Sequence, residues 1–212
     1  MDNQLIIVGG GGHAKVIIDI FNEAKKFKII GYTSKVKPDG DFVNEVPYLG
    51  SDVILKEYLN KGVKNVFVAI GDCKVRNNVF TDLTSEGFNI VNAVSKFARI
   101  SPSVTLGKGI AVMPGAMINI DSVIKDNVII NTGVTIDHDN IINKSAHIAP
   151  GTNLAGNVTI GTGSFLGVGT NVIPGVKIGE WAIVGAGSVV IEDIPSYTTS
   201  VGAPSRVIKI NK

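Results

Sequence analysis

The sequence predicts two domains of different classes, a small parallel α/β sheet over residues 1–92 and an all-β parallel helix of hexapeptide repeats over residues 93–212. Three observations predict them. The first ninety residues alternate short apolar runs with helical apolar patterns. From residue 100 onward, apolar residues recur every six positions instead. Glycine makes up 25 of the 212 residues, well above its usual share of about 7%, as expected of a fold with many turns.

Strands and helices alternate through the first domain. We expect strands at residues 5–8, 28–32 and 66–70, and helices at residues 13–26, 51–60 and 74–86. The first strand ends at four consecutive glycines, Gly9 to Gly12, and a polar loop through Pro38-Asp39-Gly40 follows the second. Ser51 is the expected N-cap of the middle helix. This alternation is typical of a small parallel sheet covered by helices.

Sixteen aliphatic residues mark the second domain in an unbroken period of six. They are Ile100, Leu106, Val112, Ile118, Ile124, Ile130, Ile136, Ile142, Ile148, Leu154, Ile160, Leu166, Val172, Ile178, Val184 and Val190. Neither an α-helix nor an alternating strand has this period, but a hexapeptide β-helix does. Each hexad forms a short strand and a turn, and three hexads complete one coil. We expect the aliphatic side chains to point inward and to stack from coil to coil, with Gly and Asn at the corners.

Composition excludes several classes of function. Lys and Arg total 20 and Asp and Glu total 18, so no basic excess favours nucleic acid or an anionic membrane. Residues 145–176 contain no charged residue, but their Gly, Asn, Thr and Pro content is unlike a bilayer-spanning helix. The N-terminus lacks a signal-peptide pattern. The single cysteine, Cys73, favours a reducing compartment, and we expect a cytoplasmic protein.

Residues 100–190, together with the closing segment 201–206, resemble the left-handed β-helix of the hexapeptide-repeat acyltransferases. With the segments Gly9–Lys15, Ala69–Asp72 and Ile136–Asn140, the whole chain resembles one bacterial subfamily. This subfamily contains the sialic acid O-acetyltransferases and the UDP-4-amino-sugar N-acetyltransferases of bacillosamine synthesis. The resemblance implies left-handed coils, a Rossmann-like nucleotide-sugar-binding first domain, acetyl-CoA as co-substrate, and a homotrimer with active sites between subunits.

The glycine-rich loop after the first strand is the first candidate site. Missing Cβ atoms and a helix N-terminus suit an anion such as phosphate, although such a loop is often only a turn. The resemblance implies that Gly11, Gly12 and His13 contact the nucleotide sugar, with Gly71 beside it. Ser34 and Lys35 stand where similar enzymes carry a pair of aspartates that holds the nucleoside. The sequence therefore does not identify the nucleotide.

His138 and Asp139 are the candidate catalytic pair. Acyl transfer from a thioester needs a general base, and the ordinary pKa of histidine suits that role near neutral pH. A neighbouring carboxylate orients the ring and stabilises the imidazolium. Alone, a histidine among acids at a turn is most often only solvated. The repeat context and the resemblance, in which Asp139 takes the supporting role, favour catalysis by His138 instead.

The resemblance also assigns residues to the two substrates. His147 would contact the acetyl donor, and the backbone N–H of Gly156 would stabilise the oxyanion of the thioester carbonyl. Asn131 matches a position near the acceptor sugar. Val168 and Ala186, eighteen residues apart, match positions that line the pantetheine groove, and their alternative role is simply to form the β-helix wall.

The sequence thus predicts an acetyl-CoA-dependent acetyltransferase that acts on a bacterial sugar, with N-acetylation of a UDP-4-amino-4,6-dideoxy-sugar as the first hypothesis. O-acetylation of a sugar such as sialic acid is the second, and a non-catalytic binding or scaffold protein is the third. A zinc enzyme is disfavoured, because zinc needs three or four ligands. The chain has three histidines, and one of them, His13, lies in the other domain. We therefore expect no metal.

Overall fold

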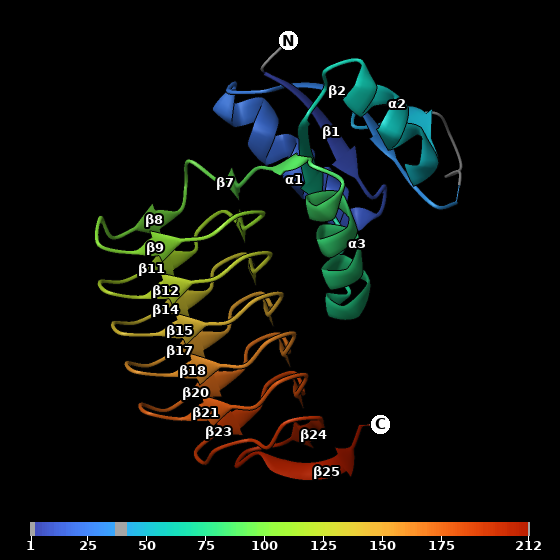
Figure 1. The fold of residues 1–212 in the computed structure, drawn as a ribbon. Coiled ribbons are helices and arrows are strands. Elements are labelled where there is room, and N and C mark those ends of the chain that lie inside the picture. Colours follow the sequence, from blue (N-terminus) through green and yellow to red (C-terminus); the bar gives the residue numbers. More distant parts are fainter. Residues whose placement is uncertain (1–2, 37–41, 212) are drawn as a thin grey trace. The chain divides into compact units, whose positions relative to one another are not determined.

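A computed structural model describes residues 3–36 and 42–211, and the chain divides into two compact units, residues 1–96 and 97–212 (Figure 1). The polar loop predicted at Pro38-Asp39-Gly40 lies outside the described residues. No helix within the two described ranges has both the length and the apolar character needed to cross a membrane.

The first unit is built on a sheet with strand order β3-β4-β2-β1-β5-β6. All neighbouring strands are parallel except β3 and β4. Its strands are β1 (Gln4–Val8), β2 (Lys28–Thr33), β3 (Phe42–Val43), β4 (Val46–Gly50), β5 (Asn65–Val68) and β6 (Asn89–Ile90), and β7 (Ala93–Val94) follows. Its helices are α1 (Gly12–Ala24), the 3-10 turn η1 (Asp52–Ile54), α2 (Leu55–Asn60) and α3 (Cys73–Ser85). The predicted parallel α/β domain is confirmed.

Alternation along the strands divides the core of this unit between the two faces of the sheet. Ile6 of β1 and Val66 of β5 belong to a buried cluster with residues of α2 and α3. Phe67, one residue on, meets Phe21 of α1 on the other face, with ring centroids 5.7 Å apart. Burial on both faces therefore explains why these strands appear as continuous apolar runs in the sequence.

The helix predicted at residues 51–60 is wrong in its first part. Residues 52–54 form the 3-10 turn η1, in which the Ile54 N–H donates to the Ser51 carbonyl, and only residues 55–60 are α-helical. The Ser51 side chain makes no capping hydrogen bond. Side-chain capping occurs at α3 instead, where Asp72 Oδ1 accepts from the Val75 N–H at 2.8 Å.

The second unit is a parallel β-helix. Between residues 99 and 190, all of which the structure describes, the chain forms sixteen two-residue strands, β8 to β23. They are β8 (Arg99–Ile100), β9 (Thr105–Leu106), β10 (Ala111–Val112), β11 (Met117–Ile118), β12 (Val123–Ile124), β13 (Ile129–Ile130), β14 (Thr135–Ile136), β15 (Ile141–Ile142), β16 (His147–Ile148), β17 (Asn153–Leu154), β18 (Thr159–Ile160), β19 (Phe165–Leu166), β20 (Asn171–Val172), β21 (Lys177–Ile178), β22 (Ile183–Val184) and β23 (Val189–Val190). Each strand ends on one aliphatic residue of the six-residue period.

Successive coils are in register at eighteen residues, so that Ile136 pairs with Leu154 and Leu154 with Val172 (Figure 1). The first face of the helix contains β10, β13, β16, β19 and β22, the second β8, β11, β14, β17, β20 and β23, and the third β9, β12, β15, β18 and β21. From Val112 onward every aliphatic residue of the period is at most 4% exposed. The hexapeptide prediction is confirmed, including the inward direction of these side chains.

The residue types at the turns are explained by the requirements of two positions of the hexad. The third residue after the inward aliphatic adopts the left-handed conformation, as at Gly133, Asp139 and Asn157. Glycine directly after the aliphatic has another cause, the close approach of the next coil. A Cβ on Gly161 would lie 2.5 Å from a backbone carbon of Gly179. The helix ends in an antiparallel pair, β24 (Thr198–Val201) and β25 (Arg206–Ile210).

Candidate active site

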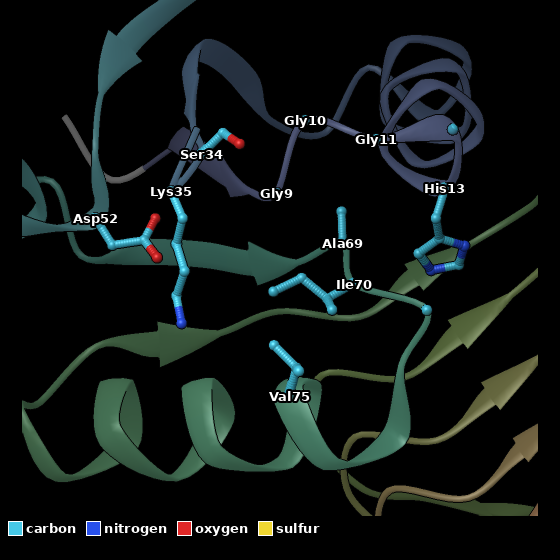
Figure 2. A pocket seen from close by; sticks show the side chains of 12 residues that line it. Gly9, Gly10, Gly11, His13, Ser34, Lys35, Asp52, Ala69, Ile70 and Val75 are labelled. Carbon is cyan, nitrogen blue, oxygen red and sulfur yellow. The ribbon is translucent and has the colours of Figure 1, made fainter. Parts of the chain in front are cut away.

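The glycine-rich loop between β1 and α1 forms one wall of a pocket of about 480 Å³ at the carboxyl ends of the parallel strands (Figure 2). The pocket is lined by Gly9, Gly10, Gly11, Gly12, His13, Ser34, Lys35, Asp52, Ala69, Ile70, Gly71 and Val75. All six residues predicted from this unit to contact substrate are therefore brought together. Such an edge is where ligands bind in open α/β sheets.

The glycines of this pocket serve two purposes. At Gly9 a Cβ would lie 2.7 Å from the Ala69 carbonyl oxygen, so the protein itself requires glycine there. At Gly11, Gly12 and Gly71 a Cβ would meet nothing within 4 Å. The chain's own packing does not require glycine at these three positions. Their missing side chains leave backbone accessible to a ligand at the N-terminus of α1, where an anion is favoured.

His13 lies at one end of the pocket, and its Nε2 atom is buried without a hydrogen-bond partner within the described residues. Burial, with the positive charge of Arg76, lowers the pKa of His13 to about 4. The imidazole is therefore neutral near pH 7. It can offer a ligand either a donor or an acceptor, according to its tautomer.

Arg76 is a residue that sequence reasoning missed. It is 1% exposed, and its Nη1 donates to the carbonyls of Ile70, at 3.0 Å, and Gly71, at 2.8 Å. Its guanidinium therefore fixes the loop that carries Gly71. Cys73 beside it is buried, which raises the pKa of the thiol and makes a nucleophilic role unsuitable.

Ser34, Lys35 and Asp52 complete the pocket at the end opposite His13 (Figure 2). The aspartate pair expected from similar enzymes after the second strand is absent, but Asp52 places a carboxylate in the same pocket from η1. Thr33 Oγ1 donates to Asp52 Oδ1 at 2.7 Å and so orients it. Sequence reasoning missed Asp52. No signal in the sequence pointed to it, because the strand that ends at Gly50 was not predicted.

His138 and Asp139 are in direct contact in the turn between β14 and β15. His138 Nδ1 lies 2.8 Å from Asp139 Oδ2, and both side chains are more than half exposed. The hydrogen bond to Asp139, together with the charges of Asp137 and Asp139, raises the pKa of His138. Asp137 also accepts the His138 backbone N–H at 2.9 Å. The carboxylates of both neighbouring residues, Asp137 and Asp139, are therefore hydrogen-bonded to His138.

Gly156 lies beneath the His138 ring, one coil further along. A Cβ at Gly156 would be 2.5 Å from His138 Cε1 and 2.6 Å from Nε2. Any larger residue would thus displace the ring. His138, Asp139 and Gly156 together define the histidine corner, formed by the turns that lead from the second face to the third.

Asn131 and His147 form a second contact, with Asn131 Nδ2 3.0 Å from His147 Nε2. Asn131 Oδ1 accepts the Thr132 N–H at 2.8 Å, which fixes the direction of the amide and makes its NH₂ face the ring. With the amide in this direction, Nε2 is the acceptor in a neutral His147 ring whose proton is on Nδ1. An edge contact with Phe165, at 5.2 Å between centroids, further orients the ring.

Val168 and Ala186 lie one coil apart and are both exposed, Val168 by 55%. Like Asn131, they are in turns that lead from the first face to the second, which we call the groove corner. The structure thus places His138, Asp139 and Gly156 at one corner of the helix, Asn131, Val168 and Ala186 at another, and His147 on strand β16 of the first face. No group of three or more His, Cys, Asp or Glu side chains suited to a metal ion occurs in the part of the chain that the structure describes.

Known proteins are similar to this chain in both of its units. Residues 4–83 match the PglD N-terminal domain. A mutant perosamine N-acetyltransferase from Caulobacter crescentus, solved with CoA and GDP-perosamine, is 41% identical, with a TM-score of 0.93 over 97% of this chain and 96% of that one. The acetyltransferase domain of PglB from Neisseria gonorrhoeae, solved with acetyl coenzyme A, is 31% identical, with a TM-score of 0.93 over 98% and 100% of the two chains.

Two further matches are more distant. WeeI from Acinetobacter baumannii is 23% identical, with a TM-score of 0.84 over 96% and 99% of the chains, a likeness that concerns the fold alone. An uncharacterised protein of Acanthamoeba polyphaga mimivirus is 32% identical over 120 residues, which are 57% of this chain and 23% of the viral protein. The predicted fold class, an α/β domain followed by a left-handed β-helix, is confirmed.

The opposite pKa shifts of His13 and His138 predict different titrations by proton NMR. We expect the His138 ring to titrate above its ordinary value of 6.5, and Asp139→Asn to lower that midpoint because it removes the carboxylate. The ring of His13 should keep a constant shift from about pH 6 to about pH 8, because its pKa is lowered to about 4. Asp121→Asn, at the equivalent turn position one coil earlier, is the control. A His138 midpoint that Asp139→Asn leaves in place would contradict the pairing.

Proposed function

Because this chain belongs to the hexapeptide-repeat sugar acetyltransferases of the PglD family, we propose that it transfers an acetyl group from acetyl-CoA to the amino group of a nucleotide-linked sugar. The observation that carries the mechanism is the His138–Asp139 pair beside Gly156. In this proposal His138 is the general base, Asp139 is the carboxylate that supports it, and the Gly156 backbone N–H is the oxyanion donor, all at the histidine corner.

The reaction follows from this geometry. The neutral amine of the acceptor attacks the thioester carbonyl, a C–N bond forms, and the C–S bond breaks to release the thiolate of CoA. His138 Nε2 takes the proton from the nitrogen as it attacks, while Nδ1–H donates to Asp139. The imidazolium then protonates the thiolate, so the base is regenerated and CoA leaves as a thiol.

Gly156 serves the same step in two ways. Its lack of a side chain leaves room for the His138 ring. Its backbone N–H donates no hydrogen bond within residues 3–36 and 42–211, which suits a donor to the oxyanion that forms at the thioester carbon. An oxyanion donor of this kind is typically worth about 10²- to 10³-fold in rate.

We assign the pocket of the first unit to the nucleotide sugar. The open backbone at Gly11 and Gly12 and the cation of Lys35 suit a diphosphate. The Asp52 carboxylate suits the hydroxyl or N–H donors of a nucleoside. The first hypothesis from the sequence is a UDP-linked sugar, and the Caulobacter protein was solved with GDP-perosamine, so both nucleotides belong in the test.

The donor side of the site is assigned to the groove corner of a neighbouring subunit in a homotrimer. Val168 and Ala186 line the groove for the pantetheine arm in this proposal, and the stretch without charged residues around Val168 suits a narrow groove. Val168, Ile173 and Ile191 are large apolar residues exposed by 40% or more, and packing between subunits would cover them. Acetyl-CoA as donor and a buried free thiol at Cys73 are consistent with the predicted cytoplasmic location.

Thiol release from acetyl-CoA tests the function directly. We expect turnover with a UDP- or GDP-linked 4-amino-4,6-dideoxy-sugar and none with free sialic acid. His138→Ala should lower kcat by about 10²- to 10⁴-fold, because it removes the base. Turnover on sialic acid alone would move the reaction to O-acetylation. Equal thiol release by the wild type and His138→Ala would exclude His138 as the base.

Mixed oligomers test the assignment of the two corners to different subunits. His138→Ala and Val168→Trp should each be inactive alone. Co-expressed in equal amounts, they should recover about a quarter of wild-type activity, because random assembly pairs an intact histidine corner with an intact groove corner at that frequency. Activity that stays at the level of the separate variants, or a monomer mass in light scattering, would contradict the assignment.

A further inference from the structure

The turn that carries His138 contains an unusual buried residue, Asn140. It occupies the fourth position after the inward aliphatic Ile136. The equivalent positions from 104 to 194 otherwise hold Val, Ile, Ala, Ser or Thr. Asn140 is 0% exposed, and a buried carboxamide is costly unless its hydrogen bonds are satisfied. Its presence at this one hexad therefore points to a local requirement.

The Asn140 carboxamide joins the histidine turn to the next coil. Its Nδ2 donates to the carbonyls of Asp137, at 2.7 Å, and His138, at 3.1 Å, within its own turn. The same nitrogen donates to the Ala155 carbonyl at 3.0 Å, and Oδ1 accepts the Val158 N–H at 3.2 Å. One side chain thus links the backbone of His138 to both sides of Gly156.

Hydroxyl residues at the same hexad position have a single hydrogen for this link. Thr170 Oγ1 shares it between the Gly167 carbonyl of its own turn, at 2.7 Å, and the Gly185 carbonyl of the next coil, at 3.3 Å. Ser164 donates to the Gly179 carbonyl, fifteen residues on, and accepts from the Ala182 N–H, eighteen residues on. A hydroxyl has one hydrogen, whereas a carboxamide has two. Only the carboxamide can donate fully to its own turn and to the next coil at the same time.

The histidine corner depends on such a link, because the His138 side chain is 54% exposed and surrounding side chains do not enclose it. The position of its ring follows from the backbone of the turn, the bond to Asp139 and the contact with Gly156. We propose that Asn140 is a positioning residue, which sets the spacing between the His138 ring and Gly156. This inference rests on the proposed function of His138.

The test compares Asn140→Ser and Asn140→Ala with Ser164→Ala, which removes a similar coil-to-coil bond away from the histidine corner. We expect both Asn140 variants to lower kcat by about tenfold or more with the KM for acetyl-CoA within about twofold, because small displacements of catalytic groups have large effects on rate. Asn140→Ser should keep a Tm close to that of Ser164→Ala. Ser164→Ala should keep the wild-type kcat.

Wild-type kcat in the Asn140 variants, or an equal loss of kcat in Ser164→Ala, would overturn the positioning role. Because Asn140→Ser introduces a hydroxyl at a position where other hexads have one, the test does not depend on the folding of Asn140→Ala. His138→Ala is measured in parallel. If it is inactive while the Asn140 variants are normal, this inference alone fails. If it is active, the proposed base fails, and the positioning role fails with it.

Discussion

The stacking of coils at an interval of eighteen residues is the constraint on which the candidate site depends. Buried aliphatic residues keep successive coils in register, as in the pair Ile136 and Leu154. Because of this register, the residue two places after Ile136 lies over the residue two places after Leu154. His138 is thereby held against Gly156 without any enclosing pocket. The site is exposed, yet its geometry is fixed by the core.

Charge and hydrogen bonding orient the side chains of the candidate site. Asp139 uses the left-handed position of the turn, which a short polar side chain tolerates, and the same residue supports the ring of His138. In the first unit a buried cation, Arg76, fixes the loop at Gly71. Burial, together with the charge of Arg76, lowers the pKa of His13 and keeps its ring neutral. Buried polar contacts in the first unit, and an exposed hydrogen bond in the second, thus orient residues that a substrate can reach.

The periodicity of the sequence predicted the repeated features of the fold, but tertiary contacts determine several residues of the candidate site that it did not predict. The inward aliphatics were predictable residue by residue, because a six-residue period fits few folds. The His138–Asp139 contact was predictable because the two residues are adjacent. Asp52 and Arg76 were not, because Asp52 reaches the pocket, and Arg76 reaches the loop at Gly71, only through contacts of the folded chain that no local sequence pattern indicates. The bonds of Asn140 likewise became visible only with the next coil in place, and Ser51 looked like a cap although the chain forms a 3-10 turn there.

The pH dependence of kcat/KM for acetyl transfer to the amino sugar tests the central claim most directly. If neutral His138 is the base, activity falls as the pH drops through its raised pKa, and Asp139→Asn moves that limb to lower pH. Asp121→Asn, at the same turn position one coil earlier, should leave the limb in place. A limb that is identical in the wild type and Asp139→Asn would assign the titration to the substrate amine and contradict the account.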